Sequence, residues 1–222
     1  MFKRFFVVFF NTLFHPKKGF ARISENRNIW NGLVVYLLIN LFVSLAAIYF
    51  THGRSVQEGF YLPPEFPPFF TPEIIEGVFR FVPLVNLLLQ LVFVPLYFLL
   101  MVGILHLVAE LFGGKGSVSS LGAVLGYGHI PYLIIALGFL TRDTALNIIG
   151  LLTIAAFLWS LWLKIVGLKI VNEFSWGRTV LVYFMPVISL TAAFLIFMLL
   201  SIVFLTPLLM QIIDGFISVP YF

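Results

Sequence analysis

Long apolar stretches recur along this chain and are separated by short polar or glycine- and proline-rich connections. Five of them cover residues 30–50, 84–112, 121–140, 146–166 and 180–205. Because about 20 helical residues cross the ~30 Å hydrocarbon core of a bilayer, each stretch is long enough to span a membrane. Only 10% of the residues are charged and 61% are hydrophobic, which is too little polar surface for a soluble globule. The sequence therefore predicts an all-α polytopic membrane protein, a five-span transmembrane helical bundle.

Residues 1–29 precede the first span and are predicted to form a cytoplasmic interfacial amphipathic segment, while residues 30–222 form the five-span membrane domain. On a helical wheel the apolar face contains Phe2, Phe6, Phe9 and Leu13, opposite Lys3, Arg4 and Asn11. Such a helix lies on a membrane surface. Four basic residues follow: Lys17, Lys18, Arg22 and Arg27. Basic segments attract anionic lipids, so we expect these lipids and the bilayer as partners, and leave open that the charges only orient the chain.

The distribution of lysine and arginine predicts how the chain is oriented. Five spans place ten of these residues on the side of the N-terminus: Lys3, Arg4, Lys17, Lys18, Arg22, Arg27, Lys115, Lys164, Lys169 and Arg178. Three fall on the other side: Arg54, Arg80 and Arg142. Since cytoplasmic flanks are enriched in these residues, we expect the N-terminus to be cytoplasmic and the C-terminus to be outside.

A glycine-rich linker joins the second span to the third. Its residues are Gly113, Gly114, Lys115, Gly116 and Ser117. The glycines are typical of a helix C-terminus, and the serine is typical of the N-cap of the next helix. The linker does not match the phosphate-binding pattern G-x-x-x-x-G-K-[ST], so nucleotide binding is not expected. Gly122 and Gly126 match G-x-x-x-G and predict close helix packing, within this chain or in a homo-oligomer.

Three ionisable groups near the linker form a candidate polar or ion site. His106 and Glu110 are four residues apart and share a helix face, and His129 lies on the next span. Ionisable groups inside a membrane are costly and therefore point to function, such as a proton or cation site. The alternative is that these side chains only bond to one another and tie two spans together.

Known catalytic patterns are missing from the sequence. It contains no cysteine, no H-E-x-x-H and no G-x-S-x-G. We therefore expect a non-enzymatic protein with no catalytic residue, no cofactor, no metal centre and no nucleic-acid partner. The connection at residues 51–82 is rich in proline and phenylalanine, and both a membrane-facing cap and a recognition loop fit this composition.

The order of several short motifs resembles the membrane domain of the Yip (Ypt/Rab-interacting protein) family. The motifs are Phe14-His-Pro16, Gly113-Gly-Lys-Gly-Ser117, Gly126-Tyr-Gly-His-Ile-Pro131, Trp159-Ser-Leu-Trp162, Gly167-Leu-Lys169 and Phe174-Ser175. The resemblance implies five spans, a cytoplasmic N-terminus and a role as membrane organiser or adaptor for partner proteins. The long polar N-terminal region of eukaryotic members is missing, so the resemblance implies a prokaryotic cell membrane. The alternative function is a small transporter or channel for protons, cations or a small solute, using polar residues of the second and third spans.

Overall fold

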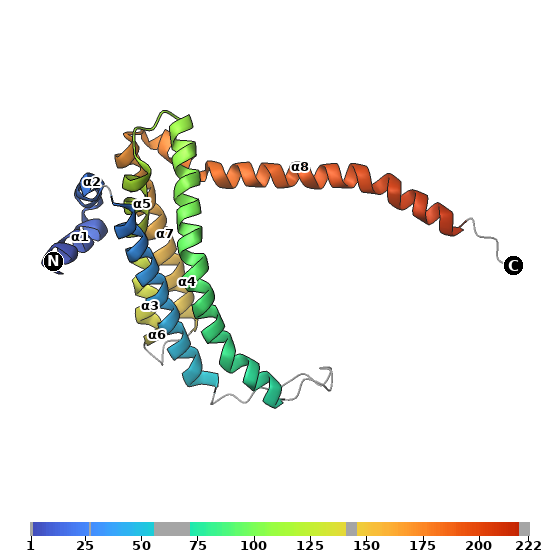
Figure 1. The fold of residues 1–222 in the computed structure, drawn as a ribbon, viewed down its shortest axis with the longest axis horizontal. Coiled ribbons are helices and arrows are strands. Elements are labelled where there is room, and N and C mark those ends of the chain that lie inside the picture. The colour runs from blue at the N-terminus through green and yellow to red at the C-terminus, as the bar shows by residue number, and fades with distance from the viewer. Residues whose placement is uncertain (1, 27, 56–71, 141–145, 218–222) are drawn as a thin grey trace.

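The computed structural model describes residues 2–26, 28–55, 72–140 and 146–217, and the secondary structure of these ranges is helical, without a β-strand. The elements in chain order are α1 (Phe2–Phe14), α2 (Pro16–Asn26), α3 (Ile29–Ser55), α4 (Pro72–Leu111), α5 (Val118–Tyr127), the 3₁₀ turn η1 (Ile130–Tyr132), α6 (Leu133–Leu140), α7 (Leu146–Asn172) and α8 (Trp176–Ile217). Figure 1 shows α3, α4 and α7 running in nearly the same direction, and α5 and α6 follow one another end to end and pack against both α3 and α7.

Five segments within the described ranges are long and apolar enough to cross a membrane, which confirms the predicted all-α polytopic fold. They are Ile29–Phe50, Leu84–Leu111, Val118–Leu140, Asn147–Asn172 and Trp176–Pro207. The helix that contains the second segment begins at Pro72, before the segment itself. Proline is favoured in the first turn of a helix, where its missing N–H is not needed.

The third segment is not one continuous helix, and a proline explains why. Pro131 has no N–H, and the chain tightens here so that Tyr132 N–H donates to the carbonyl of His129, three residues back. In an α-helix that N–H would pair with the carbonyl of Gly128. The Ser160 hydroxyl of α7 donates to this carbonyl instead, at 2.8 Å. The break is therefore stabilised by a neighbouring span.

Helix α5 lies at the centre of the bundle, and its side chains join two of the three hydrophobic clusters. Leu121 and Leu125 pack with residues of α4, α7 and α8. Ala123 and Val124, on the other side of α5, pack with residues of α2 and α7. Because seven of its ten residues are buried, α5 connects the membrane core to the N-terminal helices.

The N-terminal layer consists of α1 and α2, which form a helical hairpin against one flank of the bundle (Figure 1). The chain turns at His15, as the His15-Pro16 interruption indicates. A Cβ on Gly19 would approach the backbone of Thr12 to 2.8 Å, so glycine allows the two helices to meet closely. Phe20 and Ile23 of α2 are buried between α5 and α7.

Helix α8 packs on the bundle only through its first turns and then leaves it. Thr179 and Val182 are fully buried against the neighbouring helices. None of the described side chains after Val182 is buried, and the helix runs crosswise to α4 in Figure 1. Such a surface suits a segment whose solvent is lipid.

Some sequence-based expectations fall outside the described residues. They concern the proline- and phenylalanine-rich stretch at residues 56–71 and the basic residues Arg27 and Arg142.

Candidate functional site

The glycine linker is a tight turn that ends α4. Gly113 has φ +76°, a left-handed conformation that glycine adopts without strain. The N–H of Gly114 donates to the carbonyl of Ala109 at 2.8 Å, five residues back. This pattern is a Schellman motif, which satisfies carbonyls at the end of a helix.

The linker is fastened to the turn between α7 and α8. The Gly116 N–H donates to the buried Asn172 Oδ1 at 3.2 Å, and Lys115 Nζ donates to Glu173 Oε2 at 2.8 Å. Hydrogen bonding to Glu173 raises the pKa of Lys115 above its ordinary value of 10.5. Ser117 is the N-cap of α5, because its hydroxyl accepts from Ser120 N–H. The linker therefore joins four helix ends.

Gly122 and Gly126 face α3 of the same chain. A Cβ on Gly126 would lie 2.1 Å from the carbonyl oxygen of Gly32, and a Cβ on Gly122 would lie 2.5 Å from Ile29 Cγ1. Both distances are shorter than real Cβ atoms show to a non-bonded neighbour, so a side chain at either position would force the surrounding atoms to shift. The small residues thus let the backbones of α3 and α5 touch.

The three ionisable candidates belong to two separate sets of contacts. His106 Nε2 lies 3.3 Å from Glu110 Oε1, in the i,i+4 geometry expected from the sequence. Glu110 is 58% exposed, whereas His106 is only 15% exposed, and its Nδ1 is buried without a hydrogen-bond partner. No described contact joins either residue to His129.

His129 instead approaches a lysine of α7. Its Nδ1 lies 3.5 Å from Lys164 Nζ, and its ring contacts the rings of Tyr36 and Tyr132, with centroids 4.4 and 4.2 Å away. His129 is buried. The sequence singled out His129 but not its tyrosine neighbours, because a tyrosine in a span, such as Tyr36, is typical of an interface anchor.

A cavity of about 230 Å³ lies beside this pair, inside the bundle. It is lined by residues of α3, α4, α5, η1, α7 and α8: Tyr36, Tyr97, Phe98, Met101, Val102, Leu105, Leu125, His129, Tyr132, Phe157, Lys164 and Tyr183. Sites for small molecules are typically apolar with a few polar groups of this kind.

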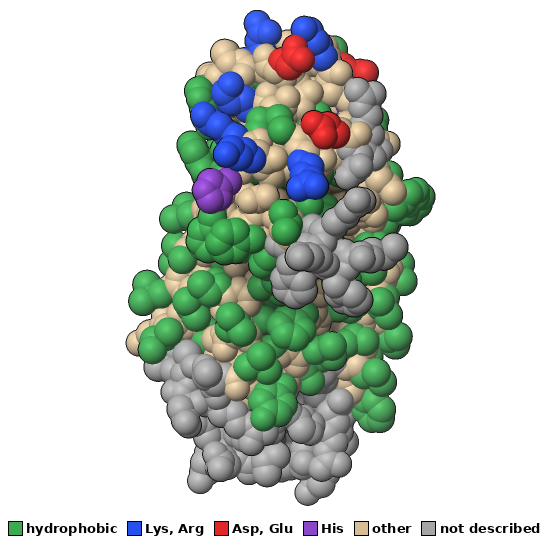
Figure 2. All heavy atoms as spheres, turned by 90° about the vertical axis from the view of Figure 1, so that its left-hand side faces the viewer, with side chains coloured by type: hydrophobic (Ala, Val, Ile, Leu, Met, Phe, Trp, Pro, Cys, Tyr) green, Lys and Arg blue, Asp and Glu red, His purple; other side chains and the backbone are tan. Residues whose placement is uncertain are grey.

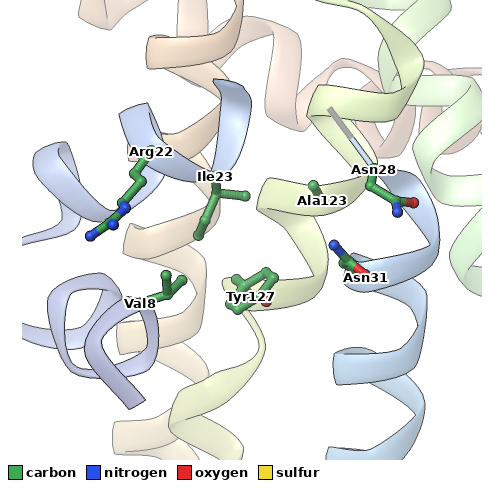
Figure 3. Close-up of a pocket in the computed structure, with 7 residues that line it drawn as sticks. All are labelled: Val8, Arg22, Ile23, Asn28, Asn31, Ala123 and Tyr127. Atoms are coloured by element: carbon green, nitrogen blue, oxygen red, sulfur yellow. The ribbon is translucent and has the colours of Figure 1, made fainter. Parts of the chain in front are cut away.

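A second hollow lies where the N-terminal layer meets α3 and α5. Its volume is about 40 Å³, enough for a water molecule or two. In Figure 3, Tyr127 lies between Val8 on one side and Asn31 on the other, while the guanidinium of Arg22 points away from the asparagine. The hollow is therefore a small gap where α1, α2, α3 and α5 meet, and the guanidinium of Arg22 faces away from it.

One end of the molecule carries exposed cations in excess of the exposed carboxylates Glu25, Glu110 and Glu173. The exposed cations at this end, here called the basic end, are Lys17, Lys18, Arg22, Lys115 and Arg178. Figure 2 shows the blue side chains, with fewer red ones among them, gathered above a broad hydrophobic belt. This separation of charged and apolar surface matches a protein whose belt lies in lipid and whose basic end lies at the headgroups.

Among the described residues, no cluster of three or more His, Cys, Asp or Glu side chains is arranged to hold a metal ion. The cation site suggested for His106, Glu110 and His129 stays a prediction.

The sequence model of the Yip1 domain matches residues 10–200. The matched range runs from α1 into α8 and includes the glycine linker and both histidines of the candidate site. No curated protein and no solved structure matches the chain significantly.

Proposed function

Because the chain belongs to the Yip1 domain family, we propose that it is a non-enzymatic membrane organiser or adaptor. In this proposal the N-terminal layer is the part that presents the protein to partners at the membrane surface. The membrane is that of a prokaryotic cell, with the N-terminus in the cytoplasm and the C-terminus outside.

The observation that carries the proposal is the way α2 is held. Phe20 is fully buried and Ile23 nearly so, against α5 and α7, while Lys17, Lys18 and Arg22 on the same helix are exposed. Two buried side chains fix the helix to the bundle, so that its three cations form a fixed surface rather than a mobile tail. A fixed basic surface at the level of the headgroups attracts both anionic lipids and the acidic surface of a protein partner.

Site-specific photo-crosslinking in native membranes tests the adaptor role. A photoreactive residue at exposed Ala21 lies among the cations of α2, and one at exposed Leu151 of α7 serves as the lipid-facing control. We expect Ala21 to give a discrete protein adduct that Leu151 does not give. The adduct should disappear when Lys17, Lys18 and Arg22 are replaced by Glu in a protein with unchanged melting temperature. Adducts with lipid alone, or adducts that survive the charge reversal, would contradict the adaptor role.

A second function, transport of protons, cations or a small solute, is favoured by two polar features of the spans. The His106–Glu110 pair and the cavity beside His129 are polar features inside the spans, and ionisable groups at such depth often belong to transport pathways. Purified protein in liposomes distinguishes the two functions. Proton or cation flux that is lost in Glu110→Ala would support transport, and no flux in either protein would favour the adaptor.

A further inference from the structure

Lys164 is a basic side chain inside the bundle, and no described carboxylate lies beside it. It lies eight residues before the end of α7, about 12 Å along the span from that end at 1.5 Å per residue. Its Nζ reaches His129 Nδ1 at 3.5 Å and lies 6.0 Å from the centre of the Tyr132 ring. No described residue forms an ion pair with it. An ammonium group at this depth is costly unless an anion or several acceptors lie beside it.

The fold makes room for this side chain. A Cβ on Gly128 would lie 2.8 Å from Lys164 Cγ, so the lysine stem passes over a glycine at the break in the third span. The Ser160 hydroxyl, one turn earlier on α7, donates to the carbonyl of the same glycine. The ammonium group is thereby directed to the cavity that it helps to line.

The titratable groups that face Lys164 across this cavity are donors or neutral rings. They are Tyr36 of α3, Tyr97 of α4, His129 before η1, Tyr132 of η1 and Tyr183 of α8, and α5 contributes only the apolar Leu125 to the lining. No Asp or Glu is among the lining residues. The cavity therefore combines one cation with phenolic O–H donors and has no carboxylate in its lining. Such a set of groups is complementary to an anion.

The cavity reaches the flank of the bundle that faces lipid. Tyr97 is 56% exposed and Phe157 is 52% exposed, and both lie in membrane-spanning segments. At about 230 Å³ the cavity is smaller than the 300–1,000 Å³ typical of sites for drug-sized ligands. It therefore accommodates a headgroup, while an attached chain would leave between Tyr97 and Phe157 into the bilayer.

From this geometry we propose that the cavity binds the phosphate headgroup of an anionic membrane phospholipid, with Lys164 as its counter-ion and the surrounding tyrosines as hydrogen-bond donors. The acyl chains lie outside, along α4 and α7. A zwitterionic headgroup binds less well because its own cation would meet Lys164. This site is distinct from the exposed basic end and does not depend on the adaptor role.

Native mass spectrometry of the purified full chain tests the site. The protein is loaded with phosphatidylglycerol or with phosphatidylcholine, and the lipid retained per chain is compared. Wild type should retain one phosphatidylglycerol in preference to phosphatidylcholine. Lys164→Met should lower that retention roughly tenfold or more, the scale of a lost charge-assisted hydrogen bond. Equal retention of the two lipids by wild type would overturn the proposal, whatever the variants do.

Matched variants separate this site from general basic charge. Lys169→Met removes a cation of the same helix that lies over Trp176, 5.4 Å from the ring centre, and should retain the lipid. Lys164→Arg keeps the charge and should also retain it. Met101→Trp keeps every charge but fills the cavity, so it should lose the lipid. Lipid loss in Lys169→Met equal to that in Lys164→Met, or full retention in folded Met101→Trp, would overturn the assignment.

Two competitors identify the source of the anion. Glycerol phosphate has the headgroup without the chains, and oleate has a carboxylate on a single chain. We expect neither to displace phosphatidylglycerol at equal concentration. Displacement by glycerol phosphate would mean a site for a soluble phosphate, and displacement by oleate would mean a site for a fatty acid; either result would overturn the phospholipid assignment.

Discussion

At the scale of single residues, the contact between Gly126 and Gly32 controls how closely α3 and α5 pack. The atom nearest to an added Cβ is a backbone carbonyl oxygen, which cannot rotate away as the end of a side chain can. A methyl group there must push two spans apart.

Gly126→Ala should therefore destabilise the protein by about 1–3 kcal/mol, the usual cost of overpacking. Gly150→Ala in α7 is the matched control, because nothing lies within 4 Å of its added Cβ. It should leave the free energy of unfolding unchanged or raise it by up to about 1 kcal/mol, since alanine favours helix. Reversible unfolding in mixed micelles measures both changes, and equal stability of the two variants would contradict the close contact.

Sequence spacing predicted some of these residue contacts and not others. The i,i+4 spacing of His106 and Glu110 implies a shared helix face, because helix geometry alone brings such residues together. The contact of His129 with Lys164 spans 35 residues and depends on how α5 and α7 pack. The G-x-x-x-G spacing predicted a close approach but left its partner open, since Gly32 has no pattern of its own to mark it.

At the scale of elements, the docking of α2 on the bundle rests on two buried side chains, of which Phe20 is the larger. Phe20 is fully buried among residues of α5 and α7. Phe10 of α1 has the same side chain but is 57% exposed.

We expect Phe20→Ala to lower the free energy of unfolding by about 3–5 kcal/mol, the usual cost of deleting a buried aromatic ring. It should also increase hydrogen exchange at the α2 amides, because the helix is no longer held. Phe10→Ala should change neither quantity. Unchanged exchange in Phe20→Ala would show that α2 is held by other contacts.

The ion pair between the two helix turns gives a pH dependence. Because the pKa of Lys115 is raised in the folded protein by Glu173, its contribution to stability is present below the pKa of the unfolded chain. That contribution is lost as the pH rises through the folded value, above about 10.5. Both side chains are well exposed, so the effect is small.

Wild type should therefore melt slightly above Glu173→Gln at pH 8, and the difference should shrink as the pH passes 10.5. Glutamine keeps the shape of the side chain at a position with φ 57°, so backbone strain is the same in both proteins. A melting difference that is constant from pH 8 to pH 11 would contradict the ion-pair origin.

The lengths of the apolar stretches predicted where the membrane segments lie. The break inside the third segment could not be predicted in the same way, because it depends on contacts with another span. Pro131 is the local cause of the break, because proline has no N–H to donate. The hydroxyl that satisfies the freed carbonyl comes from Ser160, a residue with no local signal of this role. Similarly, the apolar length of α8 indicated a span, whereas no local pattern in the sequence marks its departure from the bundle after Val182.

At the scale of the whole molecule, charge is separated from apolar surface along the bundle. The exposed cations of the basic end lie close to the α4–α5 and α7–α8 turns and on α2. The adaptor role requires this end to face the cytoplasm, where its protein partners would be. The bias of ten basic residues against three predicts that orientation, and a homo-oligomer of the chain stays a prediction alongside it.

The orientation of the basic end is the most direct test of this account. The chain has no cysteine, so single cysteines can be introduced without background. In intact cells, Lys18→Cys on α2 should react with a membrane-impermeant maleimide only after permeabilisation. Asp143→Cys, between the third and fourth spans, should react without it. Labelling of Lys18→Cys in intact cells, with Asp143→Cys protected, would place the basic end outside and contradict the account.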